Sequence, residues 1–193
     1  MNNKNTNILA IGVGGQGIIL ASEILAYALM AAGFDVKKSE VHGMAQRGGS
    51  VNSHVRFGKQ VYSPIIKEGE VDILFAFEQL ESLRYLGFLN PNTQIILNNH
   101  VINPPSVSLG VDEYPNDVPG IIKERYPHFH LANGLDLAEK VGNPRTANIV
   151  LLGVLSRYVK VDEVHWIEGI TKVLPEKLRE INIDAFRLGR DEG

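Results

Sequence analysis

A glycine-rich loop near the start of the sequence has the spacing of a phosphate-binding turn. Gly12, Gly14 and Gly17 fit the pattern G-x-G-x-x-G, between an apolar run over 7–13 and a segment of helical periodicity over 18–32. Glycine at these places permits a tight turn, lets the backbone approach a diphosphate, and allows the helix to pack closely on the sheet. Free N–H groups at the start of that helix attract an anion. The candidate binding positions are Gly12, Gly14, Gly15, Gln16 and Gly17.

The glycines of this loop also have a purely structural interpretation, in which they only let the helix pack tightly. A dinucleotide-binding protein would need, in addition, an acid at the end of the second strand to bind a ribose. Glu40 stands near that place, 23 residues after Gly17. The same strand carries Lys37 and Lys38, so Glu40 is also suited to holding the following loop or to pairing with Arg47.

A second loop combines a cation with flexible backbone. Residues 42–50, HGMAQRGGS, are too polar and too rich in glycine for a helix with a buried face. Arg47 stands beside glycine amides, a combination that clamps a phosphate or a carboxylate. His42 has a side chain that titrates near neutral pH. The alternative is a surface loop that is ordered by its arginine.

Strand and helix patterns alternate along the chain, and they must bring the two loops to one edge of a sheet. Short apolar runs predict strands at 7–13, 34–41, 71–78, 93–99 and 128–134. Apolar residues at helical spacing predict helices at 18–32, 80–89, 121–126, 136–142, 147–158, 162–174 and 175–187. This order predicts an α/β fold: an open, mostly parallel Rossmann-like sheet with helices on both faces, in a single domain over 1–193. Ligands of such sheets bind at the carboxyl ends of the strands.

Two stretches depart from this alternation. Residues 51–57 alternate apolar and polar side chains, and Gly58-Lys59 can turn the chain into a partner strand at 60–62, so we expect an inserted β-hairpin. Residues 103–120 hold several prolines and no clear period. We expect an irregular excursion there, with a short strand at 106–109.

Composition excludes several classes of protein. The 193 residues carry 19 Lys and Arg against 22 Asp and Glu, a formal charge of −3, which excludes a strongly basic nucleic-acid-binding protein. Cysteine is absent, which excludes disulfides, thiol nucleophiles and an iron–sulfur cluster held by this chain alone. No uncharged apolar run approaches the roughly 20 residues of a membrane span. We expect a soluble cytoplasmic protein without a nucleic-acid or membrane partner.

The remaining polar side chains have ordinary structural interpretations. His128 and His130 share a strand face, but no third ligand accompanies them, so we predict no metal site. His54 also shares a strand face, with Arg56, where the pair would border a site or a subunit interface. The carboxylates at 78 and 81 are typical of a helix start.

Four segments together resemble one known family. They are GVGGQGI at 12–18, EVHGMAQRGGSV at 40–51, HVRFG at 54–58 and GNPRTAN at 142–148. The combination resembles the gamma-type domain of the 2-oxoacid:ferredoxin oxidoreductases, and the sequence HGMAQRGG at 42–49 resembles the indolepyruvate branch of that family. The resemblance covers nearly the whole chain, although residues 60–130 add only a generic α/β pattern.

The resemblance implies an activity that this chain takes part in as one subunit. Such an enzyme oxidatively decarboxylates an aryl 2-oxoacid such as indolepyruvate with coenzyme A (CoA) and oxidised ferredoxin, giving the aryl-acetyl-CoA, carbon dioxide and reduced ferredoxin. Thiamine diphosphate and 4Fe–4S clusters belong to the large alpha subunit. This chain is therefore expected to hold no cofactor alone and to be inactive by itself. Without its partner, its exposed apolar interface would favour a homodimer.

The resemblance also implies roles for individual residues. The glycine loop and Arg47 would meet the phosphates of CoA, and His42 with Arg47 would help to close the active site. Asn143, Arg145 and Asn148, in the last of the four segments, would shape the same strand-end crevice. Beyond the first glycine loop, the binding candidates are Gln46, Arg47, Gly48, Gly49, Asn143, Arg145 and Asn148.

Two other functions stay open at this point. A stand-alone NAD(P)-dependent oxidoreductase would bind a nicotinamide nucleotide at the glycine loop and turn the loop at 40–57 towards its substrate. A noncatalytic interaction module would bind a partner and add nothing to turnover. The intact GVGGQG and MAQRGG sequences argue against that second alternative.

Overall fold

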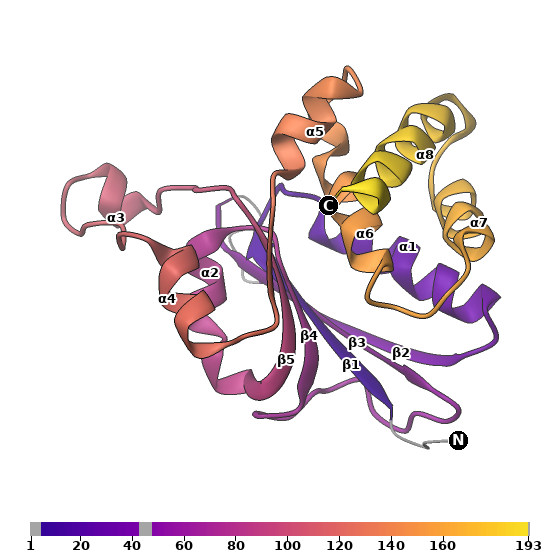
Figure 1. Cartoon of the computed structure of the whole chain (residues 1–193), viewed down its shortest axis with the longest axis horizontal. Helices are drawn as coiled ribbons and strands as arrows, with labels where there is room; N and C mark the ends of the chain where they lie inside the picture. Colours follow the sequence, from indigo (N-terminus) through magenta and orange to yellow (C-terminus); the bar gives the residue numbers. More distant parts are fainter. Residues whose placement is uncertain (1–4, 43–47, 193) are drawn as a thin grey trace.

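The computed structural model describes residues 5–42 and 48–192, and a six-stranded mixed sheet lies at its centre (Figure 1). The strands are β1 (Thr6–Val13), β2 (Asp35–His42), β3 (Ser50–Gly58), β4 (Val71–Ala76), β5 (Leu89–Asn98) and β6 (Phe129–Ala132). Their order across the sheet is β2-β3-β1-β4-β5-β6. The pairs β1–β4, β4–β5 and β5–β6 are parallel, whereas β3 runs antiparallel to both β1 and β2. The predicted open, mostly parallel sheet is confirmed.

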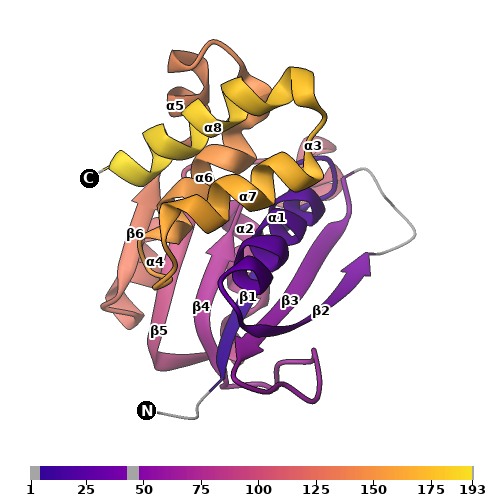
Figure 2. The same ribbon diagram turned by 90° about the vertical axis from the view of Figure 1, so that its right-hand side faces the viewer.

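Helices cover both faces of this sheet, as the alternating pattern predicts (Figures 1 and 2). One face carries α1 (Ile18–Ala31), α6 (Ala147–Ser156), α7 (Glu163–Val173) and α8 (Glu176–Asp191), with α5 (Gly134–Lys140) beside α6. The other face carries α2 (Gln79–Arg84) and α4 (Val118–Arg125). Short helical turns complete the chain: η1 (Leu86–Phe88), α3 (Pro105–Ser108) and η2 (Pro144–Thr146).

Each face of the sheet buries its own apolar core. Successive residues of a strand point to opposite faces, so Ile8 and Ala10 of β1 join the core under α1 and α6. Leu9 and Ile11 join the second core, under α2 and α4. All four side chains are almost completely buried. β1 is thus the central strand, and the glycine loop begins at its carboxyl end.

The helix after the glycine loop ends where the sequence predicts it. Gly33 has φ 86°, a left-handed conformation that glycine adopts without strain. Its N–H bonds to the carbonyl of Met30 (2.9 Å), and the N–H of Phe34 bonds to the carbonyl of Leu29 (3.1 Å). These bonds close the last turn of α1 and return the chain to β2.

The prediction of a β-hairpin is correct for its first strand, β3, and wrong for its second strand at 60–62. Residues 60–62 form no strand, and β3 pairs instead with β1 and β2 along its whole length. The turn at Gly58-Lys59 suggested a local partner, but pairing on both edges leaves no open backbone on β3. The following segment crosses one face of β3, where the N–H of Ile66 donates to Nδ1 of His54 (3.2 Å).

The proline-rich excursion contains a short helix where the sequence predicts a strand. Residues 105–108 form α3, with Pro105 at the first turn, and the N–H groups of Ser108 and Leu109 bond to the carbonyls of Pro104 and Pro105 (both 3.0 Å). Proline suits the first turn of a helix because no partner is needed for its missing N–H. The helix expected at 80–89 also ends early, since α2 passes into η1 and then into β5.

The most buried helix, α6, is in close backbone contact with α8. A Cβ at Gly153 would overlap the carbonyl oxygen of Phe186, and a Cβ at Gly189 would overlap the carbonyl oxygen of Val150. The two glycines therefore set the distance between the helices. Within the described residues, no helix is long and apolar enough to span a membrane.

Gly153→Ala and Gly189→Ala test this contact. In an isolated helix, alanine is more favourable than glycine by about 1 kcal/mol. Here, however, the added Cβ overlaps backbone and forces α6 and α8 apart. We therefore expect each variant to lower the free energy of unfolding by about 2 kcal/mol. Urea unfolding followed by circular dichroism measures the change. Gly87→Ala is the control, because a Cβ there meets nothing within 4 Å. A Gly153 variant as stable as the control would contradict the contact.

Candidate functional site

A crevice opens at the carboxyl edge of the parallel strands, where the glycine loop meets the turn before α6. Its cavity of about 330 Å³ is bordered by the loop after β1, the ends of β4 and β5, and the start of α6. The lining residues include Gly14, Gly15, Gln16, Phe77, Asn98, His100, Pro144, Arg145 and Asn148. The fold thus brings the first glycine loop and the segment at 142–148 together.

Both the oxygen and the nitrogen of the Gln16 side-chain amide form hydrogen bonds with the backbone. Its Oε1 accepts a hydrogen bond from the N–H of Val13 (2.7 Å), and its Nε2 donates to the carbonyl of Phe77 (2.9 Å). Asn98 donates to the same carbonyl (3.1 Å) and accepts from the N–H of Gly134 (3.1 Å). The two amides therefore tie the loop to the ends of β4 and β5, and Gln16 positions the loop.

The glycines of the first loop have different roles. A Cβ at Gly12 would lie 2.6 Å from the Gln16 amide oxygen and 2.8 Å from Cβ of Phe77, so this position has no room for a side chain. Gly15 has φ 104°, and nothing lies within 4 Å of where its Cβ would be. Gly15 is exposed and lines the cavity, so its backbone is open to a ligand.

The two glycine loops are joined by backbone hydrogen bonds. The N–H of Gly14 donates to the carbonyl of Gly49 (2.8 Å), and the N–H of Gly48 donates to the carbonyl of Gly14 (3.4 Å). This link exists because β3 lies next to β1. Residues 43–47 stand outside the described residues, so the structure does not test Gln46 and Arg47. His42 is described only through its backbone, which pairs with Val51.

The segment at 143–148 contains two amides that shape the backbone and one exposed cation. Asn143 Oδ1 accepts from the N–H of Arg145 (3.1 Å) and caps η2. Asn148 is buried, and its Nδ2 donates to the carbonyl of Gly17 (3.3 Å). Arg145 is exposed at the cavity, and no salt bridge among the described residues includes it. Of the three candidates, Arg145 has its charged group available for a ligand.

His100 is a cavity residue that the sequence reasoning missed. It follows the end of β5 and lines the crevice together with Arg145. Its backbone is fixed, because its N–H donates to the carbonyl of Asn98 (2.8 Å) and its carbonyl accepts from the N–H of Gln79 (3.1 Å). A polar residue placed directly after a predicted parallel strand is the signal that could have found it.

A larger cavity, of about 760 Å³, adjoins the second glycine loop. Apolar residues such as Leu80, Ile102 and Pro105 line much of it, next to Gly48 and Gly49. A third cavity, of about 510 Å³, lies on the α1 side of Gly14 and Gly15. The first glycine loop therefore has hollowed surface on two sides.

Two carboxylates border the larger cavity, and both are buried. Glu78 caps α2, as expected of a helix start, and its Oε2 accepts from the N–H of Glu81 (2.9 Å). Glu81 accepts from the hydroxyl of Ser50 (2.5 Å) and pairs with Arg84 (3.1 Å). Burial raises the pKa of the Glu81 carboxyl above its ordinary value, against the lowering effect of Ser50 and Arg84. Their burial was not evident from the sequence.

Glu40 does not occupy the ribose-binding place of a dinucleotide fold. β3 lies between β1 and β2, which moves the strand of Glu40 to about 10 Å from β1 at the usual strand spacing. Its carboxylate pairs with Lys38 (2.6 Å). The strand order therefore gives no support to nicotinamide binding through Glu40.

The other singled-out residues lie away from the crevice. His54 is a buried residue whose pKa is lowered by that burial. Arg56 donates to the carbonyls of Ser63 (2.9 Å) and Ile65 (3.2 Å). Both fasten the 59–66 segment to β3, so neither borders the crevice. Among the described residues, no group of three His, Asp or Glu side chains is arranged to hold a metal.

Comparisons with known proteins agree over nearly the full length. Residues 7–192 match the family described as Pyruvate ferredoxin/flavodoxin oxidoreductase. Indolepyruvate oxidoreductase subunit IorB of Archaeoglobus fulgidus is 41% identical, covering 96% of this chain and 94% of that protein. The same subunit of Pyrococcus horikoshii is 39% identical, with 96% and 95% covered.

Solved structures share the fold. The gamma subunit of a keto/oxoacid ferredoxin oxidoreductase from Geobacter sulfurreducens superposes with a TM-score of 0.71 at 26% identity, with 95% of each chain covered. A 2-oxoglutarate:ferredoxin oxidoreductase from Magnetococcus marinus gives 0.77 at 22% identity, covering 98% of this chain and 31% of that chain. The second likeness shows that this fold also occurs within a much longer chain.

The raised pKa of Glu81 predicts how stability changes with pH. The folded state holds the Glu81 proton more tightly than the unfolded state, so the free energy of unfolding falls as pH rises from the ordinary value of 4.5 through the raised value. Glu81→Gln removes this loss, and we expect the stability of the variant relative to the natural protein to increase over that interval. Urea unfolding from about pH 4 to about pH 8 measures it.

Glu124→Gln, at an exposed position on α4, is the matched control for the change to an amide. A stability difference between Glu81→Gln and the natural protein that decreases with rising pH would contradict the burial effect.

Proposed function

Because the chain belongs to the pyruvate ferredoxin/flavodoxin oxidoreductase family, we propose that it is the small subunit of a cytoplasmic indolepyruvate-type 2-oxoacid:ferredoxin oxidoreductase. The observation that carries this is the 41% identity to an indolepyruvate oxidoreductase subunit over almost the whole of both chains. The complex converts an aryl 2-oxoacid, CoA and oxidised ferredoxin into the aryl-acetyl-CoA, carbon dioxide and reduced ferredoxin. Relatives named as 2-oxoglutarate synthase subunits are more distant, at 28% identity or less.

The redox chemistry is assigned to a large partner subunit. On that subunit, thiamine diphosphate would supply the chemistry of decarboxylation, and 4Fe–4S clusters would supply electron transfer to ferredoxin. This chain has no cysteine, and iron–sulfur clusters are held mainly by cysteine thiolates. Its own residues therefore serve binding and positioning.

The role proposed for this chain is to bind part of CoA at the strand-end crevice. CoA carries a diphosphate and a further phosphate, so its site needs donors and positive charge. The open backbone at Gly15 and the exposed guanidinium of Arg145 border one cavity and supply both. Gln16 and Asn148 hold the loop in place by their bonds to backbone.

Arg47 is proposed as a second cation at the same phosphates. The hydrogen bonds between Gly14 and residues 48–49 join its loop to the first glycine loop. A ligand bound at Gly15 would therefore lie near residues 48 and 49, which directly follow Arg47 in the sequence. Closure of the active site by Arg47 and His42 remains part of the proposal.

The complex itself is the first test. The tagged chain is purified from an anaerobic lysate of its source, and the co-purifying protein is identified by mass spectrometry, iron content and thiamine content. We expect a large iron-bearing subunit and CoA-dependent reduction of ferredoxin with indolepyruvate. Recovery of the chain alone, free of iron, from cells that express the large subunit would overturn the proposal.

Arg145→Ala and Arg47→Ala in the reconstituted enzyme test the CoA site. A lost charged hydrogen bond weakens binding by about 1.5 kcal/mol or more, so we expect the KM for CoA to rise about tenfold for each variant. The kcat at saturating CoA should change little. Arg187→Ala is the control, because Arg187 lies on α8 and pairs with Glu163 (2.9 Å). An unchanged KM for CoA would remove the tested arginine from the site.

A further inference from the structure

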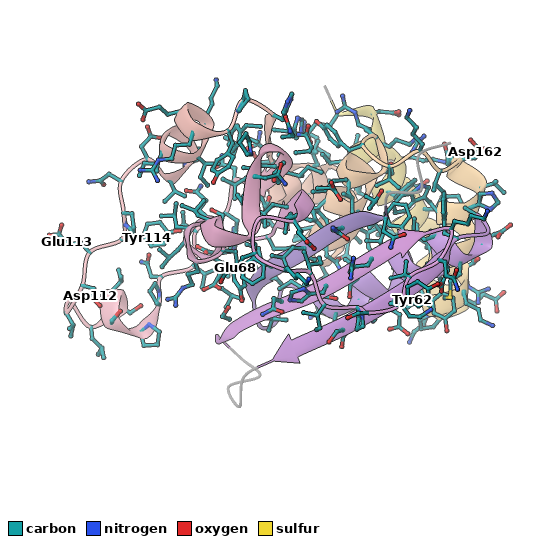
Figure 3. All side chains as sticks on the ribbon, turned by 90° about the horizontal axis from the view of Figure 1, so that it is seen from below. Tyr62, Glu68, Asp112, Glu113, Tyr114 and Asp162 are labelled. Atoms are coloured by element: carbon teal, nitrogen blue, oxygen red, sulfur yellow. The ribbon has the colours of Figure 1, made fainter. Side chains whose placement is uncertain are left out.

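The segment between β5 and α4, residues 99–117, projects from the sheet as an arm. Its short helix α3 stands well away from the helices that cover the sheet (Figure 1). Asp112 and Glu113 lie at its outer end, seen from below in Figure 3. This arm borders the larger cavity through Ile102, Pro104 and Leu109. It is thus part of the rim of the strand-end site.

A single buried carboxylate fixes both ends of the arm. Glu78 is only 1% exposed, and its Oε1 accepts from the N–H of Ile102 (3.1 Å) and from the hydroxyl of Tyr114 (2.7 Å). That hydroxyl in turn accepts from the N–H of Leu80 (2.9 Å). The beginning and the end of the arm are therefore held at the start of α2.

The interior of the arm is also ordered by its own backbone. The carbonyl of Ser106 accepts from the N–H groups of Val111 (2.9 Å) and Asp112 (3.2 Å), and the N–H of Gly110 donates to Val107 (3.0 Å). Gly110 has φ 71°, which suits the reversal after α3. The conformation of the tip is thus defined by bonds within the chain.

Several aliphatic side chains of this ordered arm are exposed to solvent. Leu109 is 78% exposed and Val111 is 75% exposed, and Val101 at its base is about half exposed. A mobile loop could turn such side chains inwards, but the anchored arm keeps them outside. Exposed apolar residues on an ordered, projecting element are typical of a protein interface.

The arm is also acidic. Between residues 85 and 122 the chain has no lysine and no arginine, and the acids Asp112, Glu113 and Asp117 are all exposed. Two copies of this arm would repel each other, because each carries the same charge. The charge fits a partner surface with an apolar groove and lysine or arginine at its rim.

We propose that the 99–117 arm is the element by which this chain docks on its large partner subunit, with Leu109 and Val111 inserted in an apolar groove rimmed by basic residues. The proposal rests on the proposed function, in which the 2-oxoacid reacts on the large subunit while this chain holds CoA. The interface must then border the strand-end site. The 99–117 arm forms the apolar edge of that interface.

The affinity of the purified large subunit for the variant Leu109→Asp/Val111→Asp tests the arm directly. Both side chains are exposed, so the fold should survive, and burying two carboxylates in an apolar groove should raise the Kd at least about tenfold. The matched control is Tyr62→Asp/Ile65→Asp, a second exposed apolar pair, on the segment after β3. The control should bind within about twofold of the natural chain. Biolayer interferometry under anaerobic conditions measures all three.

Tyr114→Phe separates the anchor from the tip. It removes the hydroxyl that joins Glu78 to Leu80 but leaves Leu109 and Val111 unchanged. We expect a Kd several times higher, with a slower association rate, because fewer molecules present the arm in its binding conformation.

The outcomes distinguish this inference from the proposed function. If the natural chain binds the large subunit and the arm variant binds equally well, the docking site lies elsewhere and the inference is overturned, while the proposed function stands. If the natural chain does not bind the large subunit at all, the proposed function fails and the inference fails with it. If the arm variant loses only self-association, measured by sedimentation, the arm is a contact between copies of this chain and the inference is wrong.

Discussion

The antiparallel pairing of β3 with β1 is the contact on which the geometry of the site depends. Val13 at the end of β1 lies opposite Ser50 at the start of β3, so the two glycine loops leave the sheet side by side. Their backbones then bond to each other at Gly14, Gly48 and Gly49. The same pairing moves β2 to the edge of the sheet, away from the crevice. A parallel second strand at that place would have given the geometry of a dinucleotide-binding protein.

The side chains of the crevice divide into those that hold backbone and those that face the cavity. Gln16, Asn98 and Asn148 each use their amide groups on backbone carbonyls or N–H groups. Gln16 and Asn98 bond through both the oxygen and the nitrogen of their amides, so they have little left to offer a ligand. Arg145 and His100 border the same cavity with ionisable groups. An anion would therefore bind to the open backbone and to these side chains, while the amides keep that backbone in place.

Local patterns predicted the parts of this fold that depend on local contacts. The buried run of β1, the glycine loop and the end of α1 at Gly33 follow from apolar spacing and from the conformations that glycine adopts. The pairing of β3 could not be predicted in this way, because its partners lie far away in the sequence and the nearby Gly58-Lys59 suggested a closer one. The residues at 106–109 include valine and leucine, which favoured a strand, but Pro105 starts a helical turn.

Burial was the other property that the sequence concealed. The sequence pattern of two acids three residues apart is the same whether a helix start is exposed or buried. Only the tertiary structure shows that Glu78 and Glu81 are buried. The comparisons tested family and fold, whereas the roles of Arg47, Arg145 and the other candidate site residues remain predictions. His100 was missed because a single histidine after a strand has no motif around it.

The buried carboxylate of Glu78 explains why a projecting arm can be ordered without a partner. A carboxylate removed from water is tolerated only when donors surround it, and here they come from α2, from Ile102 and from Tyr114. Releasing either end of the arm would leave the carboxylate short of a donor, so the arm and the helix cap stabilise each other. The arm is consequently ordered before any partner arrives. Binding to such a preorganised element loses less conformational entropy than binding to a flexible loop, and the same carboxylate holds the wall of the cavity beside the second glycine loop.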